Sequence, residues 1–188
     1  MAEKNLIKIY VDASSAKRVD IIIKHYTDFI GIVDGYTEGL RYMIESEKDS
    51  NSHRELGDLG VRVQTGGSTS DPTAKKAIRN VMTREALINC DFSGDVMEGV
   101  DRAEEFIRDA YLLRDMRKDY ELFNRQLSIL GTEKETFEKY LRREKTLIDI
   151  AEEQGITYES AQQKIHKIRL RVKKQVVGFM DGKMGGIA

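Results

Sequence analysis

Apolar residues recur every three or four positions over most of this chain, a spacing typical of amphipathic helices. In the N-terminal part the repeat comprises Val19, Ile22, Ile23, Tyr26 and Ile30. Ser14 or Ser15 can act as the N-cap of that helix. Residues 6–11 instead alternate, which fits either a short strand or the entry to a helix. We therefore predict an all-α fold with at most one short N-terminal strand.

The longest apolar repeat, residues 95–130, predicts one helix of about 50 Å. Its apolar positions are Val96, Val100, Ala103, Ile107, Ala110, Leu113, Met116, Tyr120, Phe123, Leu127 and Leu130. Such a stripe either packs in the core of one chain or forms a seam between two chains. In the second case Asp95–Leu130 would mediate a homodimer, with Met116, Tyr120, Phe123 and Leu127 at its seam.

Glycine-rich and polar stretches divide the sequence into five parts. These are 1–48, an N-terminal helical region of open role; 49–70, a linker; 71–130, a central helical region suited to oligomerisation; 131–177, a helix-turn-helix domain; and 178–188, a flexible tail. In the central region Asp71 suits an N-cap, and Pro72 suits the first helical position because the missing N–H costs nothing there.

Residues 146–174 carry the pattern of a helix-turn-helix unit. Thr146 and Thr157 can each cap a helix, and Gly155 between them tolerates the positive φ of a tight turn. Ala151 stands four residues before this glycine, where two crossing helices need a small side chain. The predicted core positions are Ile150, Ala151, Gly155, Ile156, Ala161 and Ile165.

The second helix of this unit combines a polar face with a basic C-terminal half. The net charge of the chain is −1, but residues 139–174 contain ten Lys or Arg and five Asp or Glu, a local net charge of +5. Positive charge concentrated in this way is typical of phosphate binding. The predicted phosphate contacts are Thr157, Lys164, Lys167, Arg169, Arg171, Lys173 and Lys174.

Side chains in the first turns of the second helix reach base edges in the DNA major groove when such a unit docks. Glutamine can bind adenine there with two hydrogen bonds. The predicted base-reading residues are Tyr158, Glu159, Gln162, Gln163 and His166.

Candidate chemistry outside this unit is sparse. His25, His53 and His166 have no His or Cys neighbour at ligand spacing, and Cys90 is the single cysteine, so we expect no metal and no other cofactor. No nucleophile or carboxylate has an evident base beside it, which argues against an enzyme. Without a signal-peptide pattern or a membrane-length apolar run, we expect a cytoplasmic protein with no membrane partner.

The segment "LGTEKETFEKYLRREKTLIDIAEEQGITYESAQQKIHKIRLRVKK", residues 130–174, resembles the promoter-reading C-terminal domain of bacterial sigma factors. More closely, it resembles the sigma-like ArpU/RinA-type late transcription regulators of phages and prophages. The resemblance implies a regulator that binds double-stranded promoter DNA, located in the cytoplasm of a bacterial or phage-infected host cell.

Two other functions fit the same residues. Small terminase subunits, which recognise DNA for packaging, also combine a helix-turn-helix with an oligomerising helix. A sigma-like module can alternatively bind RNA polymerase. The target sequence, the choice between activation and repression, and the role of residues 1–70 stay open at this point.

Overall fold

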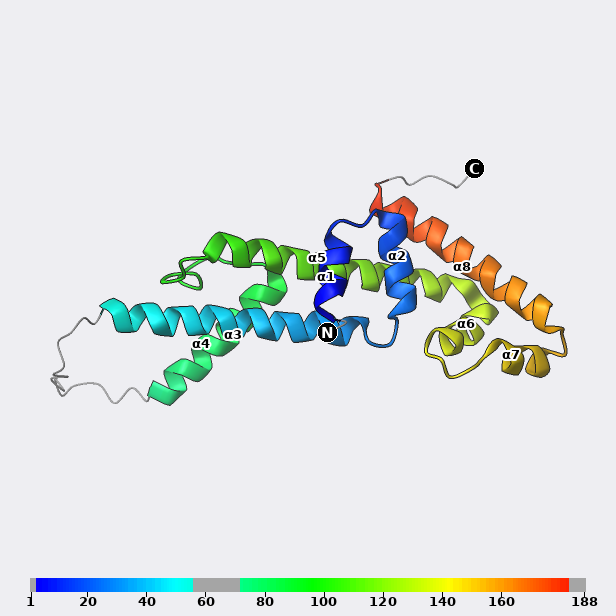
Figure 1. Ribbon diagram of the computed structural model, residues 1–188, viewed down its shortest axis with the longest axis horizontal. Helices are drawn as coiled ribbons and strands as arrows, with labels where there is room; N and C mark the ends of the chain where they lie inside the picture. The colour runs from blue at the N-terminus through cyan, green and yellow to red at the C-terminus, as the bar shows by residue number, and fades with distance from the viewer. Residues whose placement is uncertain (1–2, 56–71, 183–188) are drawn as a thin grey trace. The chain divides into compact units, whose positions relative to one another are not determined.

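The computed structural model, which describes residues 3–55 and 72–182, is all-α and confirms the predicted fold class (Figure 1). Its helices are α1 (Glu3–Val11), α2 (Ser15–Lys24), α3 (Phe29–Glu55), α4 (Pro72–Asn89), α5 (Ala103–Leu127), the 3-10 helix η1 (Ser128–Glu133), α6 (Lys134–Leu141), α7 (Leu147–Gln154) and α8 (Tyr158–Met180). Neither described range contains a strand. The alternating residues 6–11 lie in α1, where Leu6 and Tyr10, one helical turn apart, are both buried.

The chain forms two compact units. Unit 1 comprises Met1–Ile32 and Met116–Ala188, and unit 2 comprises Val33–Asp115. The sequence-based division ran consecutively along the chain and separated residues 1–48 from the helix-turn-helix domain. In the structure α1 and α2 belong to the same unit as α6, α7 and α8.

Three of the expected boundaries are wrong. Helix α3 continues to Glu55, so residues 49–55 are helical and only 56–70 of the proposed linker lie outside the described residues. Helix α5 begins at Ala103 rather than Asp95, because Gly94 and Gly99 take positive φ values of 78° and 74° that break a helix. Helix α8 extends to Met180, three residues into the proposed tail.

Aromatic side chains from α1, α3, α5 and the turn after α2 form the core of unit 1. The rings of Phe29 and Tyr120 stack with their centroids 5.6 Å apart, and Tyr10 lies 5.7 Å from Phe29. Tyr26 packs edge-on against Phe123 at 5.9 Å. These rings join the N-terminal helices to the second half of α5 through contacts between residues about a hundred positions apart in sequence.

The residues assigned to a two-chain seam are used within one chain. Met116, Phe123 and Leu127 are fully buried, and the Tyr120 hydroxyl donates a hydrogen bond to the Tyr26 carbonyl at 3.2 Å. A buried side chain cannot pack against a second copy, so the proposed seam is wrong. The single-chain interpretation of the same apolar stripe describes the structure.

Unit 2 is joined by polar contacts between α3 and the segments that follow it. The Thr83 hydroxyl of α4 donates to the buried Glu45 carboxylate at 2.6 Å. Arg84 pairs with Glu38 at 2.7 Å, and Arg102 pairs with Glu47 at 3.1 Å.

Tyr26 should make the stability of unit 1 depend on pH in the alkaline range. Burial, and after it the neighbouring Tyr120, raises the pKa of Tyr26 from 10.0 to about 12. The unfolded chain therefore releases this proton first, and stability should fall as the pH rises from 10 towards 12. Tyr26→Phe should flatten this part of the pH profile, measured as melting temperature against pH.

Tyr26→Phe also removes the hydrogen bond from the Tyr26 hydroxyl to Asn124, 2.9 Å, which should cost about 1 kcal/mol at pH 7. Tyr111→Phe, at an exposed tyrosine of unit 2, serves as the control. An unchanged alkaline profile in the Tyr26 variant would show that another group governs this pH range.

Candidate nucleic-acid interface

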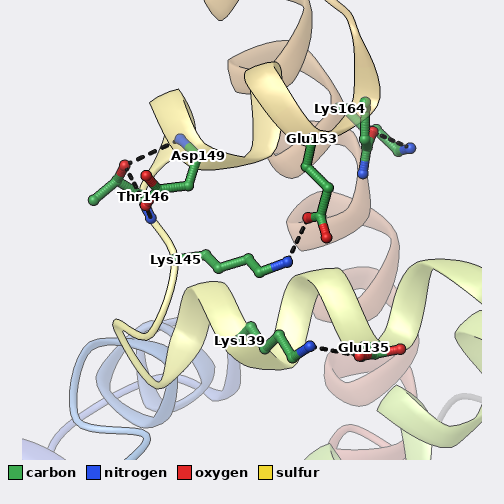
Figure 2. Close-up of polar contacts among 8 residues, drawn as sticks. Glu135, Lys139, Lys145, Thr146, Asp149, Glu153 and Lys164 are labelled. Atoms are coloured by element: carbon green, nitrogen blue, oxygen red, sulfur yellow. Dashed lines mark hydrogen bonds and ion pairs between the residues drawn. The ribbon is translucent and has the colours of Figure 1, made fainter.

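A capping box starts α7. The Thr146 hydroxyl accepts a hydrogen bond from the Asp149 backbone N–H at 3.3 Å, and the Asp149 carboxylate accepts one from the Thr146 backbone N–H at 2.7 Å (Figure 2). The backbone hydrogen bond, followed by one from the Thr146 side chain, lowers the pKa of Asp149 below its ordinary value. The box fixes where α7 begins, because it satisfies N–H groups that have no partner within the helix.

The turn between α7 and α8 requires Gly155. This residue adopts left-handed φ and ψ values of 63° and 34°, which cost glycine little. Its N–H bonds to the Glu152 carbonyl at 3.2 Å, and the Ile156 N–H bonds to the Ala151 carbonyl at 3.0 Å. This pair of bonds is the Schellman motif, which ends a helix and turns the chain sharply.

Helix α8 begins immediately after this turn. Thr157 caps it by accepting a hydrogen bond from the Ser160 N–H at 3.2 Å. Helices α7 and α8 pack against each other. Of the predicted core residues, Ile150, Ala151, Ala161 and Ile165 are buried, Ile156 is half-buried and Gly155 is exposed in the turn. The segment therefore has the geometry of a helix-turn-helix.

All five predicted base-reading residues are exposed on the N-terminal half of α8, namely Tyr158, Glu159, Gln162, Gln163 and His166. At 3.6 residues per turn, Glu159, Gln163 and His166 point away from the buried Ala161 and Ile165. Tyr158 and Gln162 lie to one side of these residues and line a groove that α2 also borders, and His166 lines the same groove. Within the predicted set, Glu159 and Gln163 therefore face outward only, whereas Tyr158, Gln162 and His166 also face the groove beside α2.

The predicted phosphate contacts are less available than the sequence suggested. Arg169 and Lys173 both pair with Asp20 of α2, at 2.9 and 2.6 Å. Arg171 pairs with Glu133 at the end of η1. The Lys164 ammonium donates to the Gln154 side chain at 2.9 Å (Figure 2). These four cations are partly or wholly engaged inside unit 1.

The other predicted phosphate contacts are Thr157, Lys167 and Lys174, all three exposed. Thr157 already serves as the cap of α8. Neither Lys167 nor Lys174 has an ion-pair partner within residues 3–55 and 72–182. On α8, the cations best placed for phosphate are therefore these two lysines.

Helix α2 explains why several of the predicted phosphate contacts are already paired. It packs beside α8, with Val19 and Ile22 fully buried (Figure 1). Partial burial raises the pKa of Asp20, but the hydrogen bonds and charges of Lys173 and Arg169 outweigh it, so the pKa lies below its ordinary value. Asp20 therefore stays ionised at neutral pH and neutralises part of the basic run.

The cations on the other wall of the groove were not among the residues predicted from the sequence. The groove has a volume of about 1320 Å³, and α2, the connection between α6 and α7, and α8 all contribute to it. Lys17, Lys24 and Arg143 line it together with Tyr158 and Gln162. The available signal was the i, i+7 spacing of the two lysines, but only tertiary structure shows that α2 lies beside α8.

Neither a protein-family model nor a curated protein nor a solved structure matches the chain. Within the described ranges, no helix is long and apolar enough to cross a membrane. The same residues contain no group of three or more His, Cys, Asp or Glu side chains that could hold a metal ion.

Proposed function

We propose that the chain is a sequence-specific DNA-binding transcription regulator that reads promoter DNA with the N-terminal half of α8. The observation that supports this most directly is the geometry of α7, the Gly155 turn and α8, with an exposed polar row on α8. Glu159, Gln163 and His166 point away from the buried side of the helix. In a docked helix-turn-helix, residues at these positions contact base edges in the major groove.

Different residues of α8 suit base reading and phosphate binding. Gln163 has two amide donors and a carbonyl acceptor, which match the N6 and N7 edge of adenine. Lys167, one turn further, is exposed and can bind a phosphate without reading sequence. The resemblance to ArpU/RinA-type regulators supports a phage or prophage origin and a role in late gene expression.

The position of the apolar stripe on α5 favours regulation over DNA packaging. A small-terminase role requires an oligomer, which that stripe could form if it were exposed. Phe123 and Leu127 are fully buried within unit 1, which removes this argument. Binding to RNA polymerase through the same domain is the result expected if the DNA test fails.

The function is tested with the full chain, because α8 packs on α2 and a C-terminal fragment would lose that support. A random pool of duplexes is enriched for tight binding, and the selected duplex is compared with unselected DNA. We expect a sequence preference, and log affinity should fall linearly with log salt. Enrichment of no sequence, together with no binding at low salt, would contradict the proposal.

Gln163→Ala should weaken binding to the selected duplex by about 1–3 kcal/mol and leave unselected DNA nearly unchanged, because one base contact is lost. Gln175→Ala is the matched control, since Gln175 is also exposed on α8 but lies more than three turns beyond Gln163. Binding of both variants to both duplexes is measured by fluorescence anisotropy. Equal losses on the two duplexes would show that Gln163 does not read sequence.

A further inference from the structure

The groove beside α8 is bordered by one face of α2. Lys17, Asp20, Ile21 and Lys24 follow the i, i+3, i+4, i+7 spacing of a single helix face, and all four line the groove. Opposite them lie Tyr158 and Gln162 of α8, and Arg143 contributes from the connection between α6 and α7. The wall beside the reading helix therefore carries cations from two other elements.

Helix α2 runs antiparallel to α8. Ser15 at its start donates a hydrogen bond to Asp181 just after the end of α8, at 2.5 Å. Further along α2, Asp20 pairs with Arg169, nearer the start of α8. This direction brings Lys24, the last residue of α2, towards the half of α8 that holds the predicted reading residues.

The cations at this end of the groove are not neutralised. Lys24 and Arg143 are exposed and have no ion-pair partner among the described residues. The acid that lines the groove, Asp20, is already paired with Arg169 and Lys173.

Lys24 and Arg143 line the groove together with His25, and both of their charges act on that imidazole. Burial lowers the pKa of His25 first, the charges of Lys24 and Arg143 lower it further, and Asp28 opposes them. Lys24 and Arg143 therefore place two positive charges where α2 ends and the α6–α7 connection passes.

We propose that Lys24 and Arg143 bind phosphates of the DNA strand beside the reading face of α8. Helix α2 and the α6–α7 connection then form a second part of the DNA interface, across the groove from α8. Phosphate contacts fix the register of a reading helix on the duplex without carrying sequence information. The ion pairs of Asp20 serve this arrangement by holding α2 against α8, and the N-terminal helices gain a role. This inference rests on the proposed DNA-binding function.

The test removes both charges from the full chain, as Lys24→Gln with Arg143→Gln. We expect weaker binding to selected and unselected duplexes alike, and a salt slope smaller in magnitude by about two, one for each lost phosphate contact. The matched control is Lys8→Gln with Lys118→Gln, which removes two exposed charges of unit 1 outside the groove. Circular dichroism melting confirms that both variants fold.

The outcomes separate the two proposals. If the unmodified chain binds DNA and the groove variant retains the salt slope of the control, Lys24 and Arg143 do not contact phosphate and the inference is overturned. If the unmodified chain binds no duplex at low salt, the proposed function itself fails. A loss confined to the selected duplex would also overturn the inference, because phosphate contacts act on every sequence.

Discussion

Phe123→Ala is expected to lower the free energy of unfolding by about 3–5 kcal/mol, the usual cost of truncating a fully buried phenylalanine. Phe123 is 0 % exposed and packs edge-on against Tyr26. The substitution removes buried apolar surface and leaves a cavity in the aromatic core that joins α5 to the N-terminal helices. Urea denaturation followed by circular dichroism measures the loss.

The same experiment separates a single-chain core from a two-chain seam. For a core residue, the denaturation midpoint should not depend on protein concentration in either the unmodified chain or the variant. Ile129→Ala, at an apolar side chain that is 67 % exposed, should change stability by at most about 0.5 kcal/mol. A midpoint that rises with concentration only in the unmodified chain would restore the dimer seam.

The local pattern of the sequence was sufficient for the helix-turn-helix. Helix caps, the turn glycine and the apolar spacing all act within a few residues, so Thr146, Gly155 and Thr157 take the positions that their chemistry predicts. The apolar repeat on α5 could also be recognised in the sequence, but the residues that pack against it could not. Periodicity shows that a face is buried without showing what covers it.

The charges could not be interpreted from sequence for a related reason. Arg169 pairs with Asp20, 149 positions earlier in the chain, and Arg171 pairs with Glu133, 38 positions earlier. A basic run read by itself is expected to be free for phosphate. Tertiary packing places part of that run in ion pairs. It also brings Lys24 and Arg143, which lie outside the basic run of α8 in sequence, to the groove beside α8.

Ala151→Asp should cost about 3–5 kcal/mol at neutral pH, because it places an uncompensated charge at the contact between α7 and α8. Ala151 is 7 % exposed, and its carbonyl accepts the Ile156 N–H bond that closes the turn. A carboxylate there must stay desolvated or push the helices apart. Either result should abolish the proposed DNA binding, because α8 loses the support that sets its angle.

Two further variants identify the cause of the loss. Ala151→Ser adds only a small hydroxyl and should be much milder, and Glu152→Asp tests the exposed neighbouring position. Burial should raise the pKa of the new aspartate above its unfolded value of about 3.9, so its cost should shrink as the pH falls through the raised folded-state pKa. The charge penalty should be gone below about pH 3, where the carboxyl is neutral in both the folded and unfolded states. Unfolding free energies at pH 7 and at acidic pH measure this difference. A loss that is equal at both pH values would point to steric crowding rather than charge at the helix crossing.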